Sequence, residues 1–324
     1  MPEAPMTAAR SLVADIGGTN TRVALATGPA VDTASIRRFR NADHPGLETV
    51  LGEYLREAGE PAVTGTCVCA AGPVKDGVAT LTNLDWTIDL ATLARATGAA
   101  RVAILNDLQA PGHALGHIAP DKLRPVIDGP QVAGGAMLVI NVGTGFNAAP
   151  VHEVPGGGRV VAASECGHVN MPIRTAADLR LAEFVETVHG FPGVEDVLSG
   201  RGLERLWSFV SSEAGAPAEA HAADIMTAID TGSDPRAAAT ARLFARLLGS
   251  EAGNLALIHL PFGGIYLVGG VARAFAAHLG PMGFADAFRD KGRFAGFMGN
   301  FAVHLLEDDY APLTGCAVYL SRMS

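Results

Sequence analysis

The 324-residue chain has few charged residues, and this shortage excludes several kinds of partner. Only 18% of its residues are charged, with 24 Lys and Arg against 33 Asp and Glu, so the formal net charge is −9. Because no block of Lys or Arg is present, the chain lacks the positive surface that binds a nucleic-acid backbone or an anionic membrane. We therefore expect neither nucleic acid nor a membrane as a partner.

Long apolar runs, a secretory leader and paired cysteines are also missing. No apolar run reaches the ~18 residues of a membrane span without a Gly, a Pro or a charge, and Met1–Arg10 has no basic start followed by an apolar stretch. The four cysteines, Cys67, Cys69, Cys166 and Cys316, form no C-x-x-C pair. Cys67 and Cys69 share one face of a strand-like run, where a free thiol serves as a small core residue. The sequence predicts a reduced, cytoplasmic protein.

The common nucleotide-binding motifs are absent as well. There is no G-x-x-x-x-G-K-[ST], which excludes a P-loop protein. No G-x-G-x-x-G opens a helix after the first strand, which argues against a dinucleotide fold. The absence of H-R-D and D-F-G excludes a protein kinase.

Glycine, by contrast, is abundant. It accounts for 39 of 324 residues, about 12% against a typical ~7%, and the excess is concentrated in strand–turn–strand patterns. A hydrophobic content of 48% supports a large buried core. The length allows two domains at the usual ~100–200 residues each.

Strand and helix patterns alternate in the first half, and helices dominate the second. In the first half we expect strands over 11–15, 21–26, 33–40, 63–71 and 101–105. We expect helices over 45–58 and 90–97, and a further helical stretch that follows Asn106-Asp107 and ends at 115. In the second half we expect helices over 175–189, 201–211, 222–230, 235–260 and 313–322, and strands over 264–268 and 301–306. This alternation predicts an α/β fold with mixed sheets flanked by helices.

The beginning of the second half repeats the beginning of the first. Leu12–Gly17 aligns with Leu138–Gly143 at an offset of 126 residues, and each segment is followed by a Gly/Thr turn and a second strand. A chance match between apolar strands is the alternative, but here the turn residues agree as well. The repeat predicts two similar lobes that face each other.

The repeated turns have the chemistry of phosphate loops. The first reads Asp15-Ile16-Gly17-Gly18-Thr19-Asn20, and the second contains Gly143-Thr144-Gly145. Glycines let backbone N–H groups approach an anion closely, and the Asp15 carboxylate could orient a hydrated Mg²⁺. A plain tight hairpin turn is the alternative for each. A third glycine pair, Gly269-Gly270, closes a later strand and suits the close approach of a base or ribose, although an ordinary strand–helix turn would look the same.

Acidic and polar residues at three other places suit sugar phosphorylation. Asn106-Asp107 stands where a strand meets a helix, so the carboxylate could accept a proton from an attacking hydroxyl, or the pair could simply cap the helix. Glu165-Cys166-Gly167-His168 could hold vicinal hydroxyls; the alternative is a surface Glu and a core His, and zinc is disfavoured because no further ligand has the right spacing. Glu195 alone carries little weight.

Taken in order, these motifs resemble bacterial glucokinase, a family in the hexokinase branch of the actin-like ATPase (ribonuclease H-like) fold. The resemblance rests on Asp15-x-Gly-Gly-Thr-Asn-x-Arg22, Leu81-Thr-Asn83-x-x-Trp86, Asn106-Asp107, Gly143-Thr-Gly145, Glu165-x-Gly-His168, Glu195-x-Val-Leu-Ser-Gly-x-Gly202 and Gly269-Gly270. It continues through Asn254-Leu-Ala-Leu, Phe262-Gly-Gly and Asp290-Lys-Gly-Arg-Phe294, so it spans nearly the whole chain. It implies a small N-terminal lobe over 1–120 and a larger, helical lobe over 121–324, with the last helix, near 313–322, packing back on the small lobe.

The resemblance also implies an activity and a set of roles. The family uses ATP and Mg²⁺ to phosphorylate the 6-hydroxyl of glucose, giving glucose 6-phosphate and ADP, and is typically a homodimer. Asp107 would be the catalytic base. The sugar would be bound by Asn83, Asn106, Asp107, Glu165, His168 and Glu195. The nucleotide would be bound by Asp15, Gly17, Gly18, Thr19, Asn20, Gly143, Thr144, Gly145, Gly269 and Gly270, with Asp15 also holding Mg²⁺ through water.

Two departures from the family pattern leave other functions open. Phe146-Asn147 replaces the usual Leu-Gly after the second phosphate turn, and Cys166 replaces a small residue. Asn147 could crowd the nucleotide or give it a hydrogen bond. The alternatives are a non-catalytic sugar or nucleotide sensor, or a kinase with another hexose preference. The zinc motif of the related repressor/kinase family is absent.

Overall fold

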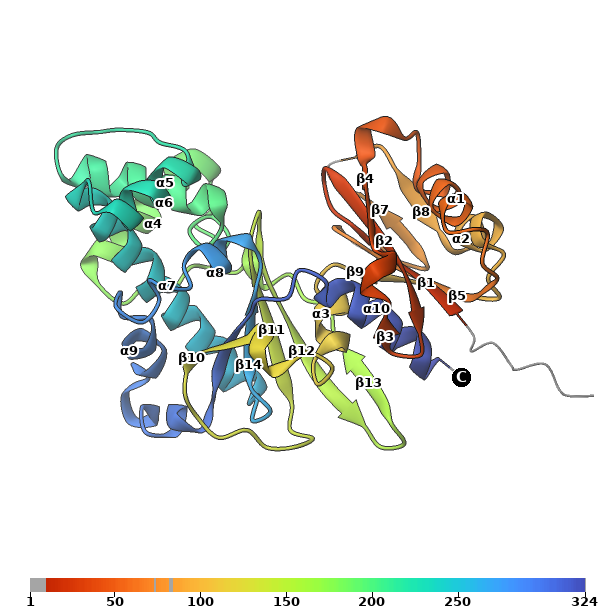
Figure 1. Ribbon diagram of the computed structural model, residues 1–324. Helices are drawn as coiled ribbons and strands as arrows, with labels where there is room; N and C mark the ends of the chain where they lie inside the picture. The colour runs from red at the N-terminus through yellow and green to blue at the C-terminus, as the bar shows by residue number, and fades with distance from the viewer. Residues whose placement is uncertain (1–9, 73, 82–83, 324) are drawn as a thin grey trace, which may run out of the picture. The chain divides into compact units, whose positions relative to one another are not determined.

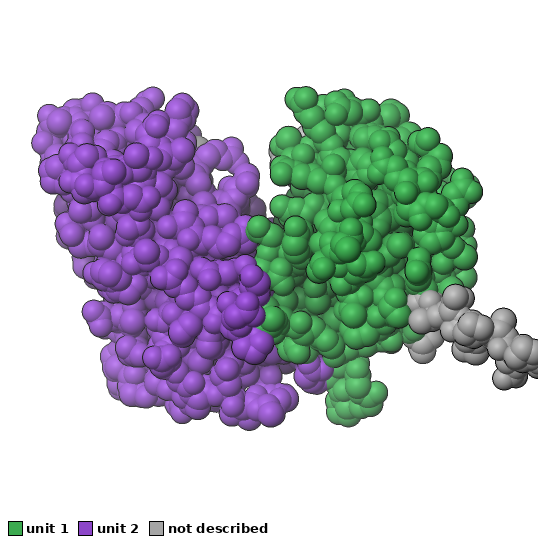
Figure 2. Space-filling view, viewed as in Figure 1, with its two compact units in different colours: residues 1–119, 154–161, 308–324 green, residues 120–153, 162–307 purple. Residues whose placement is uncertain are grey.

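The computed structural model describes residues 10–72, 74–81 and 84–323, which form two compact units, coloured separately in Figure 2. Unit 1 takes in the described residues of 1–119, 154–161 and 308–324, and unit 2 takes in 120–153 and 162–307. The sequence assigned 121–324 to the second lobe, with the last helix, near 313–322, packing back on the small lobe. The structure places 308–323 in unit 1, where the last helix packs on the central strands, and it also places 154–161 there, because this segment packs on the helix after residue 108.

A mixed sheet forms the centre of unit 1 (Figure 1). Its strands are β1 (Arg10–Ile16), β2 (Asn20–Thr27), β3 (Ala30–Val31), β4 (Arg37–Arg40), β5 (Val63–Ala70) and β9 (Arg101–Asn106). The order is β3-β2-β1-β5-β9, with β4 also paired to β2. β1 and β2 form an antiparallel hairpin, whereas β1, β5 and β9 run parallel.

Several short strands of unit 1 were not predicted. A small antiparallel sheet contains β6 (Val74–Lys75), β7 (Val78–Thr80) and β8 (Thr87–Asp89), and β13 (Gly158–Val161) also belongs to this unit. Each of these strands has only two to four residues. Segments this short contain too few alternating positions for a periodic pattern to reveal them.

Helices cover both faces of the unit 1 sheet. α1 (Leu47–Glu57) and α2 (Leu90–Thr97) lie on one face, and α3 (Gln109–Ala114) and α10 (Ala311–Arg322) lie on the other (Figure 1). Because strand side chains alternate, Leu12 of β1 packs toward α1 and α2, whereas Val13 packs toward α10. Cys67 and Cys69 share the α10 face, as predicted, and all four cysteines are free thiols.

The sheet of unit 2 repeats the strand plan of unit 1. The strands of this sheet that belong to unit 2 are β10 (Leu123–Ile127), β11 (Met137–Val142), β12 (Phe146–Val154), β14 (Ile265–Val268) and β15 (Val303–Leu306), and the full order is β10-β15-β14-β11-β12-β13. β11 and β12 form an antiparallel hairpin, and β11, β14 and β15 run parallel. The hairpin repeat inferred from the 126-residue offset is therefore present in the structure.

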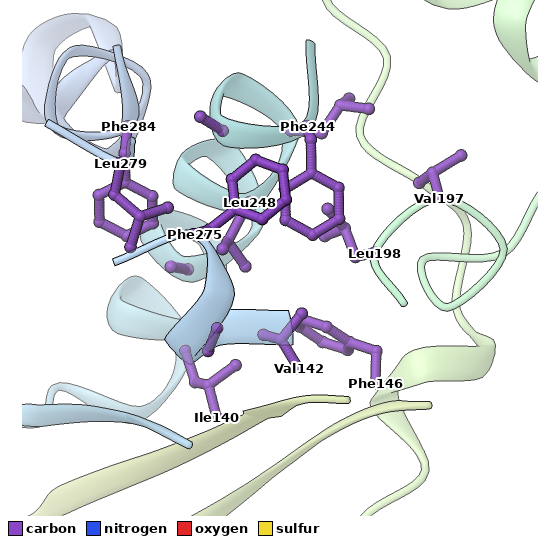
Figure 3. Packing of buried hydrophobic residues seen from close by; sticks show 14 of the residues in the cluster. Ile140, Val142, Phe146, Val197, Leu198, Phe244, Leu248, Phe275, Leu279 and Phe284 are labelled. Carbon is purple, nitrogen blue, oxygen red and sulfur yellow. The ribbon is translucent and has the colours of Figure 1, made fainter. Parts of the chain in front are cut away.

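Helices make up most of the rest of unit 2. They are α4 (Ala176–His189), α5 (Gly200–Glu213), α6 (Ala222–Thr231), α7 (Pro235–His259), α8 (Gly270–Ala274) and α9 (Phe284–Arg289). Figure 3 shows Val142 and Phe146 of the hairpin in a core with Phe244 and Leu248 of α7. The sequence predicted the longer helices α4–α7 but not the short α9. No helix in the described ranges is long and apolar enough to cross a membrane.

Candidate functional site

In unit 1 the parallel strands end together, and the predicted phosphate and base residues follow these ends. Ile16 of β1 lies opposite Ala70 of β5, which lies opposite Asn106 of β9. The Asp107 N–H donates to the Ala70 carbonyl at 3.0 Å, which extends the ladder by one residue. The carboxyl ends of parallel strands are where open α/β sheets bind their ligands. The structure therefore brings Asp15–Asn20 and Asn106–Asp107 to one edge of the sheet.

The turn between β1 and β2, Gly17–Asn20, offers backbone donors. One hydrogen bond closes it, from the Gly17 N–H to the Asn20 carbonyl at 3.0 Å. Within the part of the chain that the structure describes, the N–H groups of Gly18 and Thr19 donate to no other residue. Adjacent unpaired N–H groups beside a glycine suit a phosphate oxygen.

The side chain of Asn41, which sequence reasoning missed, supports this turn. Its amide nitrogen donates to the Gly17 carbonyl at 2.7 Å, and its backbone N–H donates to the Thr19 carbonyl at 2.9 Å. The Thr21 hydroxyl in turn donates to its amide oxygen at 2.8 Å. Asn41 is buried, so it acts as an internal brace of the turn. No motif marks it, because it lies more than twenty residues away from the turn in the chain.

Asp15 lies at the end of β1 beside a cation and a thiol. Its Oδ2 is 3.2 Å from Nη1 of Arg22, its cross-strand partner, and the Cys69 thiol lies 3.5 Å from Oδ1. Burial raises the pKa of the Asp15 carboxyl, and the Arg22 guanidinium opposes that shift. The described residues contain no cluster of three or more His, Cys, Asp or Glu that could hold a metal. A single carboxylate is a ligand type that suits a hydrated Mg²⁺.

The sequence left two roles open for Asn106-Asp107, capping of a helix and acceptance of a proton, and the structure suits Asn106 to the first and Asp107 to the second. The Asn106 side chain accepts the Leu108 N–H at 2.8 Å and donates to the Gly72 carbonyl at 2.9 Å, so it supports the start of α3. The Gln109 side chain accepts the Asn106 N–H at 3.0 Å. Asp107 itself is exposed at the sheet edge, as a proton acceptor for an attacking hydroxyl must be.

In unit 2 the second turn, Gly143–Gly145, has a related design. The Gly143 N–H donates to the Gly145 carbonyl at 2.9 Å, and the Gly200 N–H donates to the Gly143 carbonyl at 2.9 Å. The N–H groups of Thr144 and Gly145 donate to no other described residue. This turn is one residue shorter than the first, because Val142 pairs with Phe146 whereas Ile16 pairs with Thr21.

Glu195, which had little weight on sequence grounds, is held directly against this turn. Its Oε2 accepts the Phe146 N–H at 2.9 Å, and its own N–H donates to the Gly167 carbonyl at 2.9 Å. A Cβ on Gly145 would lie 2.5 Å from the same carboxylate oxygen, so only glycine leaves room for it. The second turn and the carboxylate of Glu195 therefore form one unit.

The Glu165–His168 segment packs on the same hairpin. Cys166–His168 form a single 3-10 turn, and a Cβ on Gly167 would lie 2.1 Å from the Phe146 carbonyl oxygen. The side chains of Glu165 and His168 are 76% and 69% exposed, with 4.0 Å between Oε2 and Nε2. Both polar groups can therefore reach a ligand.

Gly269-Gly270 joins β14 to α8 beside the second turn. Gly269 has φ of +102°, and a Cβ there would lie 2.4 Å from the Val142 carbonyl oxygen and 2.5 Å from Oδ1 of Asn141. A side chain is excluded at this position on both counts. Asn141 occupies in the repeat the place that Asp15 occupies in β1, and its amide lies between Gly143 and Gly269. Only the repeat could have identified it from the sequence.

The three residues of the two departures from the family pattern lie close together. Phe146 is buried and points into the core beside Val142 (Figure 3). Asn147 bonds to Ser164 and Cys166 of its own chain. Burial raises the pKa of the half-buried Cys166 thiol.

The predicted residues thus gather in two groups, each within one unit. Unit 1 brings together the turn and base residues Asp15, Gly17, Gly18, Thr19, Asn20, Asn106 and Asp107. Unit 2 brings together Gly143, Thr144, Gly145, Glu165, His168, Glu195, Gly269 and Gly270. Asn83 lies outside the described residues, so its role remains a prediction.

Comparisons with known proteins agree with the family resemblance seen in the sequence. A family model described as Glucokinase matches residues 12–323. The glucokinase of Pseudomonas paraeruginosa is 31% identical over 315 residues, covering 96% of this chain and 92% of the relative. The crystal structure of a glucokinase from an Antarctic psychrotroph has a TM-score of 0.88 at 30% identity, covering 97% of this chain and 99% of that one. A glucose complex of Balamuthia mandrillaris glucokinase, at 22% identity, shares the fold with a TM-score of 0.79 over 99% and 96% of the two chains. The expected actin-like ATPase fold is confirmed.

Proposed function

Because this chain belongs to the glucokinase family, we propose that it transfers the γ-phosphoryl group of ATP to the 6-hydroxyl of glucose, giving glucose 6-phosphate and ADP. One observation carries the proposal beyond family membership. The exposed carboxylate of Asp107 lies at the same sheet edge as the turn Gly17–Asn20, whose N–H groups suit a phosphate. A proton acceptor and a phosphate cradle on one rigid edge are the parts that phosphoryl transfer to an alcohol needs.

In this proposal the residues of unit 1 serve the reacting groups. Asp107 accepts the proton of the attacking hydroxyl. Asn106 keeps one amide hydrogen and acceptor capacity beyond its structural bonds, which suffices for a sugar hydroxyl. Gly17, Gly18, Thr19 and Asn20 hold phosphate oxygens through backbone groups. When bound, Mg²⁺ neutralises phosphate charge, and Asp15 orients it through water.

The residues of unit 2 hold the rest of the two substrates. Glu165, His168 and Glu195 bind sugar hydroxyls, and Asn83, which lies outside the described residues and is not part of unit 2, is expected to bind another. The turn Gly143–Gly145 supplies further N–H groups for phosphate, and Gly269-Gly270 leaves bare backbone for the adenosine. The family resemblance supports a homodimer in the cytoplasm. The net charge of −9 argues against a nucleic-acid partner. Light scattering on the purified protein tests the dimer.

A coupled assay for ADP release with a panel of hexoses tests the proposed activity. We expect turnover with glucose, dependent on ATP and Mg²⁺. Sugar binding without turnover on any hexose would show a sensor instead. Faster turnover on another hexose would show a kinase of different preference.

A further inference from the structure

Both the nitrogen and the oxygen of the Asn147 amide form hydrogen bonds within its own unit. Asn147 lies next to the core residue Phe146 in β12, and its side chain is on the opposite face of the strand. Its nitrogen donates to the Ser164 carbonyl, and its oxygen accepts the Ser164 hydroxyl at 2.9 Å and the Cys166 N–H at 3.2 Å. The same oxygen also accepts the Ala148 N–H at 2.9 Å. These bonds tie the amide to the protein itself and not to a nucleotide.

The bonded residues lie on either side of Glu165. The Glu165 carboxylate is 76% exposed, and its Oε2 lies 4.0 Å from Nε2 of His168. Because the side chain has so little support of its own, its direction depends on the backbone at positions 164 and 166. Asn147 bonds to the backbone at both positions.

Other contacts support this part of the chain, but each acts on only one side of Glu165. The Ser164 hydroxyl also donates to the Ala148 carbonyl at 2.6 Å, and Gly167 packs against the Phe146 carbonyl. A glycine at position 147 would offer no side chain, so no amide would join the two flanks. Cys166, the other departure from the family pattern, also contacts this amide, with its sulfur 3.5 Å from Oδ1 of Asn147.

We propose that Asn147 is a positioning residue for the sugar: by bonding to both sides of Glu165 it sets the place of that carboxylate and hence the affinity for glucose. This inference rests on the proposed glucokinase activity and on the role of Glu165 in it. The proposal predicts different effects on glucose binding and on ATP binding, because Asn147 supports the sugar-binding segment and leaves the N–H groups of the turn Gly143–Gly145 unchanged.

Steady-state kinetics of Asn147→Ala test the proposal. We expect the KM for glucose to rise about tenfold, as the loss of several hydrogen bonds implies, while the KM for ATP stays within about twofold of the wild-type value. Ser164→Ala keeps the amide's bonds to the backbone, so it should raise the KM for glucose by less, about two- to threefold. Asn300→Ala is the matched control, since that exposed amide bonds only to the Phe297 carbonyl; neither KM should change.

Direct titration of glucose by calorimetry, with thermal unfolding of each variant, completes the test. A rise in the KM for ATP as large as that for glucose would overturn the proposal, as would unchanged glucose binding by Asn147→Ala. If that variant does not fold, Asn147→Gly, which gives the residue usual in the family at this position, decides, because it removes both backbone bonds and normal glucose affinity there contradicts the proposal. A wild-type protein that neither binds nor phosphorylates glucose would overturn both the proposed function and this inference. Normal wild-type turnover, together with an unchanged KM for glucose in the variants, would overturn the inference alone.

Discussion

The two hairpin turns of the molecule are built on one strand plan and carry different side chains. In unit 1, Gly17–Asn20 follows a strand that ends in Asp15, and the exposed carboxylate of Asp107 lies at the same edge. In unit 2, Gly143–Gly145 follows a strand with Asn141 in the place of Asp15. Both turns present N–H groups that donate to no other described residue, but only the first lies beside two carboxylates.

This difference shows how a repeated backbone can be divided between two tasks. N–H groups suit phosphate at either turn, because they depend on the backbone alone. A carboxylate is useful where a proton or a cation must be handled, and it repels a polyanion elsewhere. The second turn already has the Glu195 carboxylate beside it, so the neutral Asn141 avoids a second negative charge there, whereas Asp15 and Asp107 suit the turn at which the proposed reaction takes place.

The largest expected effect comes from removing the base from unit 1. Asp107→Ala should lower kcat by about 10²- to 10⁴-fold, the usual contribution of a general base, and should change glucose affinity little. The coupled ADP assay and glucose calorimetry measure the two quantities. Asp121→Ala, at an exposed aspartate of unit 2, is the control. Near-normal turnover in Asp107→Ala would show that Asp107 is not the base and that the two turns do not differ in this respect.

Asp15→Asn makes the first turn resemble the second. If Asp15 orients Mg²⁺ through water, its loss should lower kcat by roughly 10- to 100-fold, as for other outer-shell ligands. The apparent Mg²⁺ requirement should rise as well, which a magnesium titration of the rate would show. A variant with the wild-type magnesium dependence would assign no cation role to Asp15.

The same variant should not lose stability. Burial raises the pKa of Asp15 above its ordinary value of 3.8, with Arg22 opposing the shift. The contribution of this group to stability is therefore complete below pH 3.8 and is lost as the pH rises through the raised value. Asp15→Asn lacks that loss, so its free energy of unfolding at pH 7 should equal or exceed that of the wild type. Chemical denaturation at several pH values checks this.

Local patterns allowed much of the fold to be predicted. The helix expected over 90–97 is α2, which ends at Gly98 with φ of +68°, and α4 begins at Thr175 with a capping box. Strong periodicity and terminal signals explain these successes. The short strands β6–β8 and the short helix α9 have no such periodicity, although the turn Asp76-Gly77, with φ of +52° and +74°, is a local signal for the hairpin of β6 and β7 that the sequence reasoning did not use.

The candidate site divides in a similar way. The glycine turns and Asn106-Asp107 could be found because each motif is contiguous. Asn41 could not, because its bonds join it to Gly17 and Thr21 across twenty or more residues. Asn147 was noticed as a departure from the family pattern, but its bond to Ser164 became visible only in three dimensions.

Asn141→Asp would make the second turn resemble the first. The amide oxygen of Asn141 would lie only 3.5 Å from a Cβ on Gly143, so a carboxylate there would face bound phosphate. A repulsion of about 1–2 kcal/mol in a partly solvated site corresponds to about a tenfold rise in the KM for ATP. The KM for glucose should stay near its wild-type value. Asn300→Asp, which adds an exposed charge in unit 2, is the control. An unchanged KM for ATP would show that the neutral side chain at this position is incidental.

The smallest expected kinetic effect concerns the brace of the first turn. Asn41→Ala removes the bonds to Gly17 and Thr21, and the loss of such buried bonds costs about 1–3 kcal/mol of folding stability. Because the turn only loosens, we expect the KM for ATP to rise by roughly threefold, with the KM for glucose unchanged. This is the reverse of the pattern expected for Asn147→Ala, so steady-state kinetics on both variants separate the two braces. If both variants changed the same KM, Asn41 and Asn147 would not serve different substrates.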